Sequence, residues 1–346
     1  MEEETWTGRA ARLADVARAA GVGTSIASRV LNGDPTVSIR AETRQRILEA
    51  ARELNYRPNA MARGLRLART MSLGIIINLA YYYENAEILV AVERAAAAAG
   101  YVTLIADTAD FVSRGEAYRR LLLERRVDGL LIASIFVSDE FVRELRAEGV
   151  PFVVVNRRVA GVDPSVTVDD ALGMRMAVDH LVGLGHSRIG YVAGPADVDP
   201  ASRRLEGFRA GMRAAGLRVP ARLVKPCLVD DESVLAATGA LLAEKPPPTA
   251  IAVWSPTAAV PALSLARRLG IRVPGQLSVI AYNDSPIAGY LAPPLTTVHM
   301  PLAEMARGAV ACLLDGIGGG APASFVVRTP PVLVERESTG PVPGPA

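Results

Sequence analysis

The sequence has little of the residue types on which many enzymes and most disulfide-bonded proteins depend. Its 346 residues include only two cysteines, Cys227 and Cys312, which lie far apart and lack the spacing of a zinc site. The pattern excludes a disulfide framework and favours a reducing compartment. Only three histidines occur, so a hydrolase triad or a histidine-rich metal site finds little material.

The signatures of common nucleotide-binding and hydrolase folds are also missing. There is no Walker A sequence and no G-x-S-x-G elbow. The glycine-rich run G-L-G-H-S-R-I-G at 183–190 follows a predicted helix and precedes a predicted strand, the wrong order for a phosphate-binding loop. We therefore expect no catalytic residue, no metal and no cofactor, with an enzyme kept as the minor alternative. Within the run, His186 is expected to cap the preceding helix.

No apolar run is long enough to span a membrane, since even the alanine stretch at 95–99 is closed off by Gly100. The first residues, M-E-E-E-T-W-T-G-R, are acidic and polar, and no apolar signal-peptide core follows them. We expect a cytoplasmic protein with no membrane partner.

Lysine is nearly absent, and the abundant arginines are unevenly distributed. Residues 9–70 contain twelve arginines and five acidic residues, a net charge of +7, although the whole chain carries only +2. A basic N-terminal segment on a mildly acidic remainder predicts a polyanionic partner for that segment alone. The alternative is that the charge serves only solubility.

The segment 13–32 predicts two short helices joined by a tight glycine turn. A helix-turn-helix presents its second helix to the DNA major groove in this way. A third helix is expected from about Ser38, its plausible cap, to about Asn55. The predicted core of these three helices consists of Leu13, Val16, Ala17, Val22, Val30, Ile47 and Leu54.

From Met71 onwards, apolar β-prone runs alternate with helical stretches, the pattern of parallel sheets covered on both faces. The rhythm restarts near residue 171, which predicts two similar α/β lobes with a cleft between them. We expect an N-terminal domain at 1–59, a marginal helix or linker at 60–70, and an effector-binding and dimerisation domain at 71–346. The ranges expected for the two lobes are about 71–166 with 299–322, and about 167–298 with 323–340.

An ordered series of motifs runs along nearly the whole chain. It comprises L-A-D-V-A-R-A-A-G-V at 13–22, S-R-V-L-N at 28–32, L-N-Y-R-P-N-A-M-A-R-G-L at 54–65, H-L-V-G-L-G-H-S-R-I-G at 180–190, R-L-E-G-F-R-A at 204–210, L-S-V-I-A-Y-N-D at 277–284, P-P-L-T-T-V at 293–298 and V-E-R-E-S-T at 334–339. The series resembles the LacI/GalR family of bacterial transcriptional regulators. The resemblance implies an all-α helix-turn-helix DNA-binding domain plus an α/β bilobal effector domain of the periplasmic-binding-protein kind.

The same resemblance implies a homodimer, in some members a tetramer, that binds a pseudo-palindromic operator in double-stranded DNA. Such a regulator is a repressor controlled by a small-molecule effector, a sugar or related metabolite, in the interlobe cleft. The family's base-reading positions correspond to Thr24, Ser25 and Arg29, with Ser28 and Asn32 near phosphates. Capping of the helix is the alternative for Thr24.

Leu65, with Ala62 beside it, matches the family's hinge leucine, which is wedged into the minor groove. Such a wedge unstacks a base step and kinks the duplex. The alternative is a packing leucine at the domain junction, but the surrounding segment is too rich in arginine to bury.

The effector site is expected where strands end at the cleft, because ligands of parallel sheets lie beyond the carboxyl ends of the strands. The candidate residues are Tyr82, Glu84, Asn85, Asn156, Arg204, Trp254 and Asn283. Trp254 fits an aromatic platform and a core residue equally well. Ser255-Pro256 stand where the family often has Asn-Asp, a departure from the typical sugar sensor.

Two other readings of the sequence remain open. In one, the N-terminal module has lost its DNA function and the chain only binds a small molecule. In the other, the chain binds DNA without small-molecule control.

Overall fold

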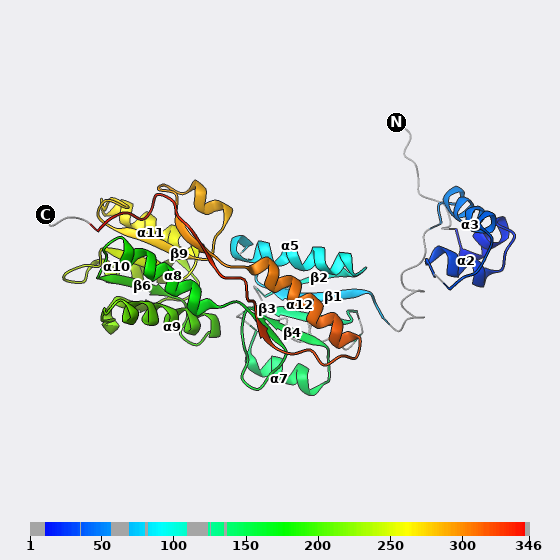
Figure 1. Cartoon of the computed structure of the whole chain (residues 1–346), viewed down its shortest axis with the longest axis horizontal. Helices are drawn as coiled ribbons and strands as arrows, with labels where there is room; N and C mark the ends of the chain where they lie inside the picture. Colours follow the sequence, from blue (N-terminus) through cyan, green and yellow to red (C-terminus); the bar gives the residue numbers. More distant parts are fainter. Residues whose placement is uncertain are drawn as a thin grey trace. The chain divides into compact units, whose positions relative to one another are not determined.

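The computed structural model describes residues 11–34, 36–56, 69–79, 82–108, 124, 126–134 and 137–342, with the backbone alone for 82–84. The chain divides into two compact units, Met1–Thr70 and Met71–Ala346, which we call the module and the body (Figure 1). Within the described ranges, no helix is long and apolar enough to cross a membrane.

The module is a three-helix unit formed by α1 (Leu13–Ala19), α2 (Thr24–Leu31) and α3 (Ala41–Glu53). Gly21 turns the chain between α1 and α2 with φ +63°, a conformation that a residue with a side chain rarely adopts. Residues from all three helices pack in the core, including Val16, Val30 and Ile47. Leu54, predicted to lie in this core, is instead 38% exposed.

The third helix begins later than predicted, at Ala41, and Ser38 does not cap it. Val37 is buried and Ile39 packs against the same core. Alternate residues point to one side only in an extended chain, so packing both of them keeps residues 37–40 out of the helix.

The first lobe of the body is a parallel sheet with the strand order β11-β5-β4-β3-β1-β2. One face packs on α7 (Asp139–Ala147), and the other on α5 (Tyr82–Ala98) and α12 (Leu302–Ile317), as Figure 1 shows. The strands are β1 (Ser72–Ile77), β2 (Val102–Asp107), β3 (Gly129–Ala133), β4 (Phe152–Val155), β5 (Ser165–Thr167) and β11 (Phe325–Val326). Because both faces are covered, β1, β3 and β4 are almost continuously apolar.

The second lobe repeats this plan with the order β12-β10-β9-β8-β6-β7, in which β12 is antiparallel. Its strands are β6 (Ile189–Ala193), β7 (Val224–Pro226), β8 (Ala250–Val253), β9 (Ser278–Tyr282), β10 (Thr296–His299) and β12 (Val332–Val334). Its helices are α8 (Asp170–Gly183), α9 (Asp199–Ala214), α10 (Asp231–Leu242), α11 (Pro256–Arg268) and the short turns η2 (Ala221–Leu223) and η3 (Pro286–Tyr290). The fold class predicted from the sequence is confirmed.

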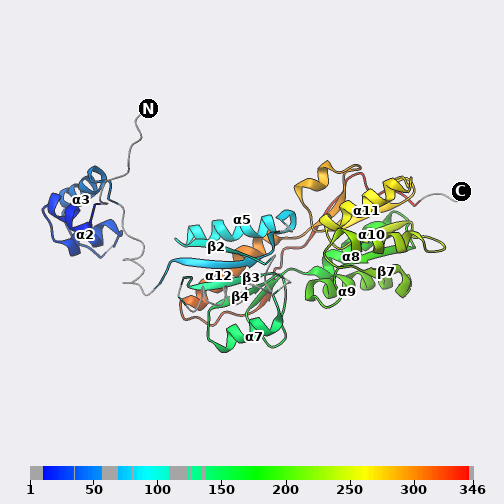
Figure 2. The same ribbon diagram turned by 180° about the vertical axis from the view of Figure 1, so that it is seen from behind.

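The chain crosses between the lobes at three places, from β5 to α8, from β10 to α12 and from β11 to β12 (Figures 1 and 2). The last crossing corrects one expected range, because β11 pairs with β5 in the first lobe, whereas 323–340 was assigned to the second. Ser324 anchors the strand by accepting the Ser165 N–H at 2.7 Å. Phe325 then lies against α12, close enough that a Cβ on Gly308 would meet its ring at 2.7 Å.

His186 does not cap the helix before it. Its ring is buried and bonds Thr249 Oγ1 at 2.9 Å through Nδ1 and Ser278 Oγ at 3.0 Å through Nε2. The Gly340 carbonyl lies 3.0 Å from the same Nε2. Burial lowers the pKa of His186, so the neutral ring ties the chain near its C-terminus to the second sheet.

Candidate functional site

The outer face of α2 is a surface of small hydroxyl side chains. Gly23 is the residue that caps the helix, and no side chain bonds there, so Thr24 is the first helical residue and does not act as a cap. Thr24 and Ser25 are exposed, while Ala27 and Val30 are buried beneath them. The core thus fixes which face of α2 points outward.

Arg29, on the side of α2, is held by the turn that follows the helix. Its Nε donates to Asp34 Oδ2 at 2.9 Å and its Nη2 to Thr36 Oγ1 at 2.8 Å. The Thr36 hydroxyl and the Arg29 guanidinium together lower the pKa of Asp34 far below its ordinary value. The carboxylate therefore stays charged and orients the arginine.

The remaining DNA-binding candidates fall into two groups. Asn32 donates through Nδ2 to the Ser28 carbonyl at 2.7 Å and so closes the end of α2. Ala62 and Leu65 lie outside the described residues.

A cleft between the lobes, with about 790 Å³ of space that includes its open mouth, brings five effector candidates together. They are Asn85, Asn156, Arg204, Trp254 and Asn283. The side chains of Tyr82 and Glu84 lie outside the described residues. The prediction missed Ser134, which follows β3 and lines the same cleft; the rule that selected the other strand ends applies to it as well.

Asn156 and Asn283 hold equivalent positions in the two lobes, directly after β4 and β9, which occupy matching places in their sheets. Both have left-handed backbones, with φ 61° and 68°, a conformation that asparagine tolerates better than most residues. In each, the side-chain oxygen is buried and has no hydrogen-bond partner within the described part of the chain. The cleft therefore contains one unpaired acceptor from each lobe.

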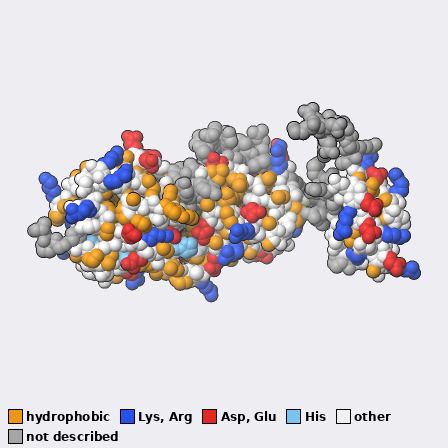
Figure 3. Space-filling model, turned by 90° about the horizontal axis from the view of Figure 1, so that it is seen from above, with side chains coloured by type: hydrophobic (Ala, Val, Ile, Leu, Met, Phe, Trp, Pro, Cys, Tyr) orange, Lys and Arg blue, Asp and Glu red, His pale blue; other side chains and the backbone are white. Residues whose placement is uncertain are grey.

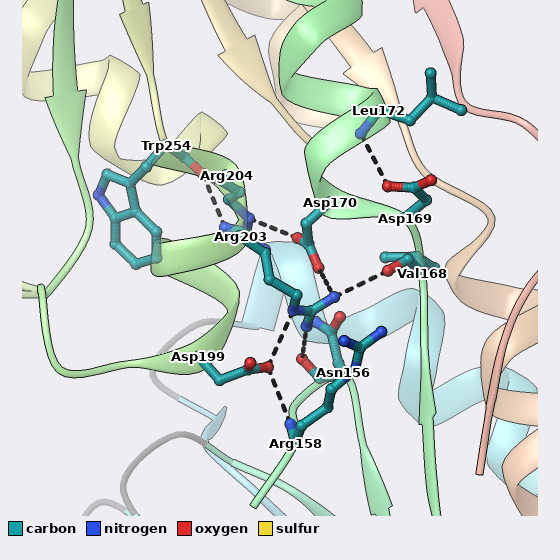
Figure 4. Close-up of polar contacts among 10 residues, drawn as sticks. All are labelled: Asn156, Arg158, Val168, Asp169, Asp170, Leu172, Asp199, Arg203, Arg204 and Trp254. Atoms are coloured by element: carbon teal, nitrogen blue, oxygen red, sulfur yellow. Dashed lines mark hydrogen bonds and ion pairs between the residues drawn. The ribbon is translucent and has the colours of Figure 1, made fainter. Parts of the chain in front are cut away.

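Arg204 lies at the second-lobe side of the cleft and is 4% exposed. Its Nε donates to Asp170 Oδ1 at 2.8 Å and its Nη1 to the Trp254 carbonyl at 3.0 Å (Figure 4). Its guanidinium stacks 4.0 Å from the Tyr282 ring centre. Burial alone would lower the pKa of Arg204, but the Asp170 carboxylate raises it above its ordinary value, so the side chain stays charged and already paired.

Trp254 has a position that is compatible with both of the predicted alternatives. It lines the cleft and packs against the apolar clusters on both faces of the second sheet. The departure at Ser255-Pro256 starts a helix, because Ser255 Oγ accepts the Ala258 N–H at 3.1 Å and Pro256 opens α11. The start of α11 therefore explains why serine and proline occupy these two positions.

The two guanidinium groups that line the cleft are both paired with carboxylates that lie outside its lining. Arg157, its second guanidinium, is buried, donates to the Ser134 carbonyl at 3.0 Å and pairs with Asp139. No carboxylate is among the described residues that line the cleft, and the residues open to description contain no cluster of metal-ligating side chains. Such a site suits a neutral polar ligand.

Comparison with known proteins gives consistent matches for both units. Residues 12–59 match the family model "Bacterial regulatory proteins, lacI family", and residues 178–339 match "Periplasmic binding protein-like domain". The transcriptional regulator MalR of Streptomyces coelicolor is 37% identical over 96% of this chain and 98% of its own length. The transcriptional repressor PurR of Proteus mirabilis is 32% identical over 95% and 96%.

Solved structures agree with these matches. The lac repressor dimer bound to operator and the anti-inducer ONPF aligns with a TM-score of 0.82 and 28% identity, over 96% of this chain and 100% of that one. The complex of the transcriptional regulator CelR with cellobiose aligns with a TM-score of 0.72 and 31% identity, over 95% and 99%. A helix-turn-helix module joined to a bilobal body with a polar cleft, together with relatives of this identity and coverage, shows that the chain is a transcriptional regulator of the LacI family.

Proposed function

We propose that the chain is a sequence-specific repressor that binds a pseudo-palindromic operator as a dimer and is controlled by a neutral sugar in the interlobe cleft. The observation that carries the proposal is the combination, in one chain, of an outward hydroxyl face on α2 and a preformed cleft with unpaired acceptors. We place its action in the bacterial cytoplasm, where the DNA is.

The DNA contacts are assigned by the exposure of the side chains on α2. Thr24 and Ser25 are short, so they allow a close approach of the helix to the major groove and bond base edges there. Arg29, anchored by Asp34, presents a guanidinium to guanine or phosphate with little loss of side-chain freedom. Ser28 and Asn32 lie on the neighbouring turn, near the DNA backbone. Ala62 and Leu65 are assigned to the minor groove from the family resemblance alone.

The chemistry of the cleft favours hydroxyl groups over phosphate. Two of the unpaired buried atoms in the cleft, Asn156 Oδ1 and Asn283 Oδ1, are acceptors, and a third, Trp254 Nε1, is a donor, so a ligand must bring both donors and acceptors, as a hydroxyl group does. Both guanidinium groups already have a carboxylate partner, Asp139 for Arg157 and Asp170 for Arg204, so neither is free to hold a phosphate. Trp254 offers the apolar face of a ring to the ligand.

Dimer formation has support from an apolar edge of the first lobe. Val102, Leu104 and Ile105 lie on β2, the outer strand of the sheet as far as the structure describes it, and are 64%, 42% and 51% exposed. Exposed apolar side chains on an edge strand favour association with another chain. On the face of the body seen in Figure 3, hydrophobic side chains lie among single charges of both signs. We assign this edge to contact with a second copy of the chain. Sedimentation of the pure protein in an analytical ultracentrifuge measures its mass and so detects the dimer directly.

Three experiments test the DNA-binding part of the proposal. Selection of binding sites from random duplexes should return a symmetric sequence, and failure to enrich any sequence would contradict DNA recognition. Leu65→Ala should weaken binding to that site far more than to random DNA, since the wedge acts at one base step; equal losses on both would argue against the wedge.

The affinity for DNA should also fall steeply as the salt concentration rises, because the basic module displaces counterions from DNA.

A thermal-shift series addresses the effector. At least one of glucose, maltose and cellobiose should raise the melting temperature of the full chain, because a ligand that binds the folded state stabilises it, and its phosphorylated form should do so less. A phosphorylated compound that binds better than its neutral parent would overturn the assignment of a neutral ligand. Operator binding without a response to any compound would favour a regulator without small-molecule control. Ligand binding without operator binding would favour a module that has lost its DNA function.

A further inference from the structure

Arg203 stands next to the cleft residue Arg204 but does not itself line the cleft. Its side chain is 12% exposed and reaches from α9, in the second lobe, toward the end of β4 in the first. Its Nη2 donates to the Asn156 carbonyl at 3.2 Å and its Nη1 to the Val168 carbonyl at 2.9 Å. Val168 lies in the crossing between β5 and α8, so one guanidinium contacts both lobes and the chain that joins them.

Asp199 adds a second link at the same place. From the first turn of α9, its Oδ2 accepts the Arg203 Nε–H at 3.0 Å and the backbone N–H of Arg158 at 2.9 Å. Arg158 follows β4 by three residues. Figure 4 shows these contacts converging between the two lobes. Hydrogen bonds with a charged partner are the stronger kind, and here they join α9 to the first lobe twice.

The arrangement also holds two residues of the cleft. The Asn156 carbonyl is bound by Arg203 and its N–H donates to the Val166 carbonyl at 2.9 Å, so the backbone is fixed while the side-chain oxygen stays unpaired. Asp170, fully buried, bonds Arg204 through one oxygen and pairs with Arg203 through the other. Arg203 is thereby linked to one cleft residue of each lobe without lining the cleft.

We propose that Arg203 and Asp199 form an interlobe clamp that holds the lobes in the arrangement in which Asn156 and Arg204 meet one ligand. The proposal rests on the proposed function for the identity of the ligand, but not for the position of the lobes. Arg203 is a positioning residue: opening the clamp separates the lobes and lowers ligand affinity without removing a ligand contact.

The first test measures the distance between the lobes in the full chain without ligand. Spin labels report this distance when they are attached to cysteines introduced at two exposed positions, Glu140→Cys on α7 and Glu232→Cys on α10. The native cysteines are buried, so labelling is directed to the introduced ones. Arg203→Lys keeps the positive charge beside Asp170 but loses the planar fork that reaches two carbonyls. Asp199→Asn is a second variant, which keeps the shape of the side chain and removes its negative charge. Both should shift the distances to longer values and broaden them.

The matched control is Arg209→Lys, at an exposed position of the same helix, which should leave the distances unchanged. Amide exchange at Arg158 should speed up by about tenfold in Asp199→Asn, because that N–H loses a charged acceptor. Distances and exchange identical to the parent in both clamp variants would overturn the proposal.

The ligand arm uses glucose, maltose and cellobiose as probes. Any of these that binds the parent should bind Arg203→Lys about tenfold or more weakly, the loss expected for one charged hydrogen bond, and Arg209→Lys as well as the parent. Equal affinity in Arg203→Lys and the parent would overturn the positioning role. If none of the three binds the parent, the assignment of a neutral sugar fails, while the label distances still decide whether the clamp exists.

Discussion

The module and the body use polar side chains in opposite ways. In the module, the polar contacts join residues close in sequence, as in the link from Arg29 to Asp34, and the candidate recognition groups are open to solvent. In the body, the bond from Arg204 to Asp170 joins residues 34 positions apart, and that from His186 to Ser278 spans 92. The module thus displays its polar groups to another molecule, whereas the body encloses them around a cleft.

The two units also differ in the size of their cores. Among the described residues, one small cluster of buried side chains supports the module, whereas three clusters, one of them continuous through both lobes, support the body. Small domains bury a lower fraction of their surface and are correspondingly marginal. We therefore expect two separate unfolding transitions, with the module the less stable.

The largest expected effect is on the body. Asp170→Asn removes the carboxylate that the buried Arg204 shares with the partly buried Arg203, and removing one partner of a buried ion pair costs about 3–5 kcal/mol. Denaturant unfolding of the full chain should show the body transition at lower denaturant and the module transition in place. A loss below about 1 kcal/mol, the size of a surface ion pair, would mean that the network is solvated.

The second-largest effect is expected in the module, with the body left intact. Ile47→Ala opens a cavity in the module core, where Ile47 is fully buried, at a cost of about 2–5 kcal/mol. That is enough to unfold a marginal module and abolish DNA binding, while the body and its ligand affinity stay intact. Ile26→Ala, at a residue 39% exposed, is the control and should leave the module folded. Loss of ligand binding in Ile47→Ala would show that the two units do not fold separately.

A smaller effect is a difference in how the stability of the two units depends on pH. All three histidines lie in the body, and burial lowers the pKa of both His180 and His186 from 6.5. The unfolded chain then takes up protons first, so the stability that these residues contribute is present above pH 6.5 and is lost as the pH falls below it. Asp34 of the module, with its depressed pKa, loses its contribution only below its ordinary value of 3.8.

Denaturant midpoints of the two transitions between pH 7.5 and pH 5, taken at about half-unit steps as a titration near the ordinary histidine pKa requires, check this difference. The body midpoint should fall and the module midpoint should not. His186→Gln, whose side chain does not titrate, should make the midpoint of the body depend less on pH. An unchanged dependence would show that His186 does not contribute to it.

The sequence predicted the body well because its signals are local. Strands buried on both faces, such as β3 and β4, are continuous apolar runs, so their own sequence is enough to predict them. The strands β5 and β12, of three residues each, are too short for any periodicity to reveal them. Strand ends also led directly to Asn156 and Asn283, since residues beyond parallel strands line the cleft.

Contacts between distant residues could not be predicted in this way. Nothing in the local pattern pairs Arg203 with the Asn156 carbonyl, or shows that Asp170 lies between two arginines. His186 was expected to cap a helix because its sequence neighbours end one, but its partners come from β9 and from the C-terminal chain. The late start of α3 depends on Val37 and Ile39 reaching the core, which is also a tertiary effect.

The smallest expected effect on stability falls on the recognition surface. Thr24→Ala and Ser25→Ala change exposed side chains, so each should alter module stability by less than about 0.5 kcal/mol. Each should nevertheless weaken binding to the selected operator while leaving binding to random DNA nearly unchanged, because base contacts carry specificity. A parallel loss on both DNAs would assign these hydroxyl groups to the phosphate backbone.

The most direct test of the account is the operator affinity of the full chain with and without a saturating sugar that raises its melting temperature. Fluorescence anisotropy at constant salt should show the dissociation constant changing by about 5-fold or more, the usual range of allosteric coupling. The sugar affinity should change by the same factor when operator is bound, since the coupling is reciprocal. An operator affinity that stays the same while the sugar demonstrably binds would contradict control of the module by the cleft.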